Sequence, residues 1–237
     1  MLLRYLTTEI LKLRRSLALL LCLAAPTCVV VLATLMALDK EEPVLLPMFG
    51  MSTAAFWAFA MLPLTLTALS VLLAQIEHGP RAWNMLLTMP GAWPNVYLAK
   101  ALVMAALIAA MTLLLFIEAW TAAGFIAMIK PVGEAFAPGD LAQILSKMTV
   151  AAILVAMLQL WVALRFRSFV PPLVFGIAGT FVAIAATSAK QGIYFPWLLA
   201  VNMLSQGDRQ AFALWLGGAG GLVVLLAMLV HLGRHEA

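Results

Sequence analysis

The chain has 237 residues, of which 65% are hydrophobic and 10% charged, and its formal net charge is +4. Soluble globular domains carry about 45–50% apolar and about 25% charged residues, so the composition excludes an ordinary soluble domain. The apolar residues form long unbroken runs, whereas the strands of a membrane barrel are short and alternate in polarity. We therefore expect an all-α membrane protein with a single transmembrane domain over residues 1–237.

Six apolar stretches approach or exceed the length of about 20 residues that a helix needs to cross a bilayer core. They are residues 16–38, 51–75, 100–129, 148–164, 169–188 and 211–232. With a cytoplasmic N-terminus, nine of the 14 Lys and Arg residues fall inside and five outside. Basic residues favour the cytoplasmic side, so we expect both termini there. The positive net charge then reflects topology and does not indicate a nucleic-acid partner.

Residues 1–15 are basic and amphipathic. At helical spacing, one face carries Leu2, Leu6, Ile10 and Leu13, and the opposite face carries Arg4, Thr8, Lys12 and Arg15. This pattern predicts a helix that lies in the membrane interface with its basic side toward lipid headgroups. The alternative is a basic flank that only fixes the orientation of the first span.

Residues 76–99 form the one sizeable polar interruption on the expected cytoplasmic side. Pro80 suits a first helical turn, and Pro90-Gly91 ends a helix, so a short helix is predicted over 81–89. Its apolar face combines Trp83, Leu86 and Leu87, which is typical of a helix that docks on a partner. Further along, Trp93, Tyr97 and Lys100 have the spacing of an interfacial anchor at the foot of the third span.

The expected outer side has one half-apolar segment, residues 189–210, which is too short to cross the membrane and is broken by Pro196. We predict a re-entrant or interfacial segment there. The outer loops also combine aromatic and acidic side chains, which suits a cationic, apolar ligand: Phe136, Tyr194, Phe195 and Trp197 with Glu41, Glu42, Glu134 and Asp140. The alternative is that the aromatic residues only anchor helices at the interface.

Two features lie inside the spans. Gly217 and Gly221 have the four-residue spacing that lets membrane helices approach closely. Glu118 is the only acid well inside a span, and intramembrane acids are functional candidates. It lies about 27 Å beyond Lys100 at about 1.5 Å per residue, so we expect it near the outer edge unless the span tilts. Glu118 could therefore bind substrate or take part in coupling. The alternative is that it only contacts outer water or pairs with Lys147 or Lys190.

The inventory of side chains contains no catalytic set and no set of metal ligands. The glycine-rich stretch at 217–221 lacks the Lys-Ser/Thr that ends a phosphate-binding loop. All three His residues lie at the expected cytoplasmic edge, so no pair of His residues lies within the membrane to hold a haem or a catalytic zinc, and Cys22 and Cys28 are interpreted as small apolar residues of the first span.

The chain contains three short motifs. The first is Glu9-x-x-Lys12-x-Arg14-Arg15-Ser16. The second is Glu77 followed by Trp83, Leu86-Leu87, Pro90, Tyr97 and Lys100, and the third is Phe195-Pro196-Trp197. Together these motifs resemble ABC transporter permeases of the type-2 exporter class, in particular those of the lantibiotic-immunity and bacitracin-resistance type. The chain departs from the expected pattern at Gly79-Pro80-Arg81, where more charge is usual.

The resemblance implies a permease subunit with six spans in the bacterial inner membrane that expels amphipathic peptide antibiotics. It implies a connecting helix over 1–15 with Glu9, Lys12, Arg14 and Arg15, and a coupling helix with Glu77, Arg81, Trp83, Leu86 and Leu87. Glu118, Phe195 and Trp197 are then the candidate substrate or gate residues. The chain would bind no cofactor and have no enzyme activity. ATP and Mg would sit on two copies of a separate ATPase, beside a second permease subunit.

Two other functions stay compatible with the sequence. The first is export of lipids or hydrophobic drugs. The second is a non-transport role as a membrane receptor or assembly factor.

Overall fold

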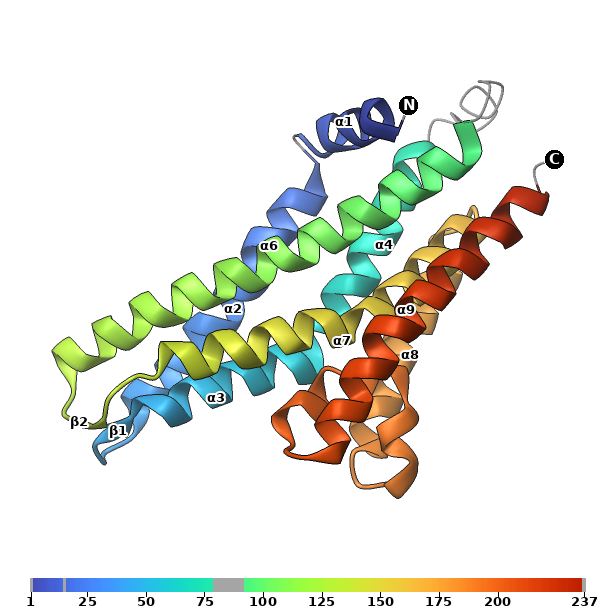
Figure 1. Ribbon diagram of the computed structural model, residues 1–237. Coiled ribbons are helices and arrows are strands. Elements are labelled where there is room, and N and C mark those ends of the chain that lie inside the picture. Colours follow the sequence, from blue (N-terminus) through green and yellow to red (C-terminus); the bar gives the residue numbers. More distant parts are fainter. Residues whose placement is uncertain (1, 15, 79–91, 236–237) are drawn as a thin grey trace.

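The computed structural model describes residues 2–14, 16–78 and 92–235, and this part of the chain is almost entirely helical (Figure 1). The α-helices are α1 (Leu2–Leu13), α2 (Leu17–Asp39), α3 (Leu46–Phe56), α4 (Leu62–His78), α6 (Ala92–Ile129), α7 (Pro138–Arg165), α8 (Val170–Ala186) and α9 (Asp208–His235). Two short strands, β1 (Val44–Leu45) and β2 (Val132–Glu134), pair in parallel. The expected all-α membrane protein is thereby confirmed.

Five helical stretches are long and apolar enough to cross a membrane. They are Leu17–Asp39, Leu46–Ile76, Asn95–Ile129, Pro138–Arg165 and Asp208–Arg234. Each contains or nearly matches one predicted span. The remaining predicted span, 169–188, forms α8, which is apolar but has 17 residues and therefore a length of about 26 Å. Six spans thus remain a prediction.

Several helices begin earlier in the chain than the sequence predicted. The fourth span was expected from residue 148, but α7 begins at Pro138, where proline suits the first turn. The second span was expected from residue 51, but α3 begins at Leu46. The loop predicted over 76–99 is narrower, because α4 continues to His78 and α6 begins at Ala92. Polar residues such as Asp140, Gln143 and Lys147 hid the start of α7 from a hydropathy count.

One span contains a π-helical segment, Trp57–Met61, which joins α3 to α4 without a break. Pro63 lies two residues beyond this segment, and a proline ring in a helix collides with the carbonyl group four residues earlier. One wider turn relieves this collision: the N–H of Leu62 donates to the carbonyl oxygen of Trp57, five residues back. The span therefore continues from Leu46 to Ile76 as one rod.

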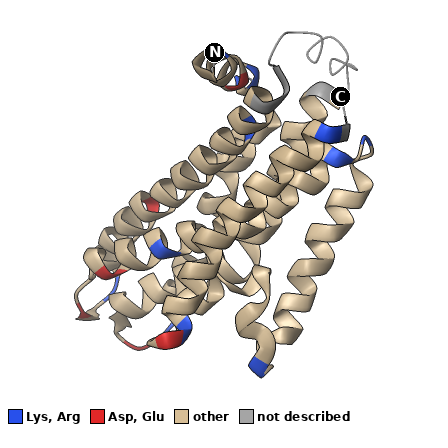
Figure 2. Cartoon of the chain, turned by 45° about the vertical axis from the view of Figure 1, so that its right-hand side comes forward, with Lys and Arg blue, Asp and Glu red and all other residues tan. Residues whose placement is uncertain are grey.

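The chain places both of its ends on the same side of the bundle, together with the end of α4 and the start of α6 (Figure 1). The paired strands lie at the opposite end. Lys and Arg residues lie at both ends, whereas most of the acidic residues lie at the second (Figure 2). We refer to these as the termini end and the strand end.

The segment from α1 to β1 runs beside the segment from α6 to β2 in a constant register. Lys100 contacts Glu9, Glu118 contacts Thr27, and the Lys130 ammonium donates to a carbonyl oxygen of Lys40, with sequence separations of 91, 91 and 90. The parallel pairing of Val44 with Val132 continues this arrangement. The two segments therefore travel side by side from the termini end to the strand end.

On the other side of the bundle, α9 packs against α7 through glycines. A Cβ atom at Gly217 would lie 2.4 Å from the Cα of Ala151, and one at Gly221 would lie 2.6 Å from Cγ2 of Ile153. Atoms cannot approach that closely, so both positions require glycine for this packing. The backbone itself forms the contact at Gly217, and it has no rotamer that could move aside.

Candidate functional site

A buried ionic cluster joins three helices at the termini end. Glu9 of α1 is 3% exposed and Lys100 of α6 is fully buried. The Lys100 ammonium lies 2.7 Å from Oε2 of Glu9 and donates to the carbonyl oxygen of Leu73 in α4, at 3.1 Å. Lys12 holds the other carboxylate oxygen of Glu9 at 2.6 Å. The cluster therefore ties α1 to both α4 and α6.

This cluster corrects two predictions from the sequence. Tyr97 and Lys100 were expected to anchor the third span at the membrane surface, but they are 1% and 0% exposed. The reason is that α6 begins at Ala92, so this stretch packs beneath α1. Lys12 was expected to face headgroups, yet it pairs with Glu9. Of the remaining residues predicted for the connecting helix, Arg14 is exposed, and Arg15 lies outside the described residues.

The predicted coupling residues stay untested. Arg81, Trp83, Leu86 and Leu87 lie outside the described residues, as does the side chain of Glu77. The structure does describe the helices on either side of residues 79–91. Leu73 and Lys100, two members of the ionic cluster, belong to the helices that lead into and out of residues 79–91.

Glu118 lies deeper in the bundle than predicted. Its Oε1 atom is 2.7 Å from the hydroxyl oxygen of Thr27, which is 10 residues from the start of α2 and 12 from its end. This contact places Glu118 at the middle of α2 and not at its outer end. The prediction failed because part of α6 extends past the start of α2, as the position of Lys100 shows. Lys147, one suggested partner of Glu118, instead donates to Gln210.

A groove of about 480 Å³ begins at this contact and follows α2 and α6 toward the strand end. Its walls are largely apolar, and its polar side chains are Thr27, Thr34, Glu118 and Thr121. Sequence reasoning missed both Thr27 and Thr34. The constant register between the two segments pairs Thr27 with Glu118, but that register becomes apparent only from the structure.

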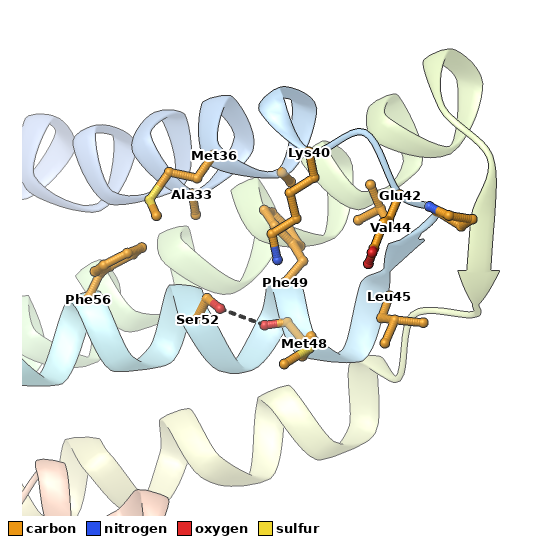
Figure 3. A pocket seen from close by; sticks show the side chains of 12 residues that line it. Ala33, Met36, Lys40, Glu42, Val44, Leu45, Met48, Phe49, Ser52 and Phe56 are labelled. Atoms are coloured by element: carbon orange, nitrogen blue, oxygen red, sulfur yellow. Dashed lines mark hydrogen bonds between the residues drawn. The ribbon is translucent and has the colours of Figure 1, made fainter.

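A second hollow, of about 270 Å³, lies between α2 and α3 at the strand end (Figure 3). Met36, Phe49 and Phe56 give it apolar walls, and the Lys40 side chain points from α2 toward α3. Glu42 lies at the same pocket, so charges of both signs border an apolar space. Such a pocket can hold the apolar part of an amphipathic molecule while the polar part of that molecule remains at the rim.

The aromatic residues that were predicted to share an outer surface form two separate groups near the strand end. Trp197 is only 6% exposed, and its ring lies 5.5 Å from that of Phe195 and 5.1 Å from that of Phe175. Gly179 makes room for this packing, because a Cβ atom there would lie 2.3 Å from the indole ring. Trp197 therefore belongs to the core of the protein, whereas Tyr194 is 63% exposed. Phe136 packs separately, against α3.

A further buried polar contact was missed by the sequence prediction. Gln159 of α7 donates to the hydroxyl group of Thr67 in α4 at 3.0 Å, and both residues are buried. Gly176 of α8 packs onto them, since a Cβ atom there would lie 2.0 Å from the hydroxyl oxygen. The contact holds α4, α7 and α8 together.

Comparison with known proteins gives the family. A search of curated proteins found no match, but the family model described as "ABC-2 family transporter protein" matches residues 5–183 of the 237. The match spans α1 to α8 and so includes the ionic cluster and both hollows. Apolar helices of membrane-crossing length accompany it. The chain therefore belongs to the ABC-2 family of transporter proteins, as a multi-pass membrane permease that works with an ABC ATPase partner.

Proposed function

We propose that this permease exports amphipathic, cationic peptides from the outer leaflet of the bacterial inner membrane, with both termini in the cytoplasm. ATP and Mg bind to two separate ATPase chains, and a second permease subunit completes the transporter. The buried ionic cluster is the observation that carries the coupling part of this proposal. It joins α1 to the two helices that border residues 79–91.

The coupling step follows from that connection. An ATPase that binds Trp83, Leu86 and Leu87, flanked by Glu77 and Arg81, displaces the ends of α4 and α6. The Glu9–Lys100 pair passes this displacement to α1, because a buried ion pair separates only at high cost. Since α1 leads directly into α2, the movement reaches the groove and the pocket, both of which α2 lines.

The substrate class is supported by the chemistry of the strand end. Exposed acids there, including Glu42 and Glu134, attract cations. The hollows beside them are lined mostly by apolar side chains, so an apolar face can be buried while charges stay at the surface. The similarity to immunity permeases in the N-terminal and 77–100 motifs points to peptides. A lipid or hydrophobic drug is the competing substrate.

The coupling part can be tested with Trp83→Ala. Truncation of a fully desolvated aromatic anchor typically costs at least about 2 kcal/mol of binding free energy. The variant should therefore lose the ATPase during purification. Trp215→Ala is a matched control, because Trp215 is 75% exposed on α9 and lies far along the chain from residues 79–91. Retention of the ATPase by Trp83→Ala would remove this loop from the mechanism.

The substrate part needs cells that express the permease together with its ATPase. Growth is measured against a panel of membrane-active cationic peptides and against a lipid-like drug. A raised inhibitory concentration for peptides, lost in the Trp83→Ala cells, is expected. A shift for the drug alone would replace peptide export by drug or lipid export. No shift for any compound, with the ATPase still bound, would favour a receptor or assembly role.

A further inference from the structure

The groove between α2 and α6 has the properties of a binding site inside the membrane. These helices lie side by side over much of their length (Figure 1). Glu118 marks the inner end of the groove, and Phe125 and Leu38 line it toward the strand end. Most of the lining is apolar, so the acid stands out as the one charged group among the described residues that line it.

The Glu118 carboxylate has too few hydrogen-bond donors. The Thr27 hydroxyl oxygen lies 2.7 Å from Oε1 of Glu118 and 2.8 Å from the carbonyl oxygen of Leu23. A hydroxyl group has one proton, so it can donate to only one of these acceptors at a time. The Oε2 atom is buried and has no hydrogen-bond partner among the described residues, and the same holds for the hydroxyl of Thr34. A donor is missing at this position.

An ammonium group supplies what is missing. It has three N–H donors and a positive charge, and it accepts no hydrogen bonds. In an apolar surrounding, an unsatisfied carboxylate oxygen is costly and a cationic donor is its strongest partner. The last torsion of a Glu side chain is broad, so a turn of the carboxylate brings Oε2 to the groove. An anionic or purely apolar ligand would leave Glu118 unsatisfied.

The depth of the site excludes the headgroup of an ordinary lipid. Thr27 lies 12 residues from the end of α2, which corresponds to about 18 Å along the helix. A headgroup at the membrane surface does not reach that far. The occupant is therefore a molecule that carries its amine into the bilayer on a hydrophobic body, such as an alkylamine or the lysine side chain of an inserted amphipathic peptide.

We propose that the α2–α6 groove binds the protonated amine of a membrane-dissolved hydrophobic molecule and that Glu118 recognises it. The biological role of this site rests on the proposed export function, because Glu118 would select a substrate by its protonated amine. A second copy of the chain is the competing occupant of the same face, because Val31 and Phe125 are 51% and 52% exposed there.

Binding can be measured without any ATPase. The permease is reconstituted in nanodiscs of phosphatidylcholine and exposed to dodecylamine that carries a photoreactive diazirine, with the diazirine-bearing dodecanol as the neutral match. Labelled peptides are mapped by mass spectrometry. The amine should label α2 and α6 and bind about tenfold more tightly than the alcohol, as expected for one charge-assisted hydrogen bond.

Three variants sharpen the result. Glu118→Gln keeps the size of the side chain and should bring amine binding down to that of the alcohol. Asp208→Asn removes an exposed acid at the start of α9, a helix that does not line the groove, and should change nothing. Val31→Phe enlarges a side chain that lines the groove and should weaken labelling by both probes. Because Val31 is half exposed, this variant keeps the fold and tests the groove independently of Glu118.

Equal binding of amine and alcohol, or unchanged amine binding in Glu118→Gln, would overturn the inference. So would efficient disulfide formation between copies of a Phe125→Cys variant together with absent labelling, because a second copy would then fill the groove. Failure of peptide export with amine labelling intact would count against the proposed function and leave the site in place. Intact peptide export without amine labelling would reject the site alone.

Discussion

The ionic cluster at the termini end allows a graded test with one acid and two lysines. Glu9→Gln leaves the fully buried Lys100 ammonium without its carboxylate, and loss of one partner of a buried pair costs about 3–5 kcal/mol. Lys100→Met should cost less, about 3 kcal/mol, because Lys12 still holds one oxygen of Glu9. Lys12→Met is the control: its side chain is 25% exposed, and such pairs contribute about 0–1 kcal/mol.

Thermal unfolding of the purified permease in mild detergent measures these differences. For a chain of this size the midpoint falls by about 2–4 °C per kcal/mol. Glu9→Gln should therefore lower the midpoint by roughly 10 °C and Lys12→Met by at most about 4 °C. The double variant Glu9→Gln/Lys100→Met should be no less stable than Glu9→Gln, which corresponds to a coupling energy of about 3 kcal/mol. Additive losses, or equal effects of the two lysine variants, would refute the assignment of Lys100 and Glu9 as a pair.

Two further predictions concern topology and packing. A cysteine introduced at Glu134 should react with a membrane-impermeant reagent added to sealed cells, and one at Asn84 should not; external labelling at Asn84 would reverse the proposed orientation. Gly217→Ala should destabilise the permease by about 1–3 kcal/mol, because the added methyl group meets the backbone of α7. Gly218→Ala should be milder, since its nearest obstacle is a side-chain atom of Val150 at 3.2 Å, and equal losses would show that close packing at Gly217 is unimportant.

Hydropathy predicted most of the fold, because crossing a bilayer imposes a length and an apolar composition that single sequences display. It placed five spans and the amphipathic helix before them. It could not predict where helices continue beyond the apolar core, which is why α6 was expected to begin near Lys100 and not at Ala92. The burial of Lys100 depends on an acid 91 positions away, and the burial of Trp197 depends on the absence of a side chain at Gly179. Residues this far apart in the chain become neighbours only through tertiary packing, which a hydropathy count does not show.

The constant register between the α1–β1 and α6–β2 segments limits how the permease can change shape. Sliding α6 along α2 by one helical turn, about 5.4 Å, would break the contacts at Glu9, Thr27 and Lys40 at the same time. The three contacts act like rungs of a ladder, so the two segments resist shear as one body. Movement during a transport cycle is therefore expected at the boundaries of this body with α7, α8 and α9. The α1–β1 and α6–β2 segments would then move together as one rigid arm that spans the bilayer.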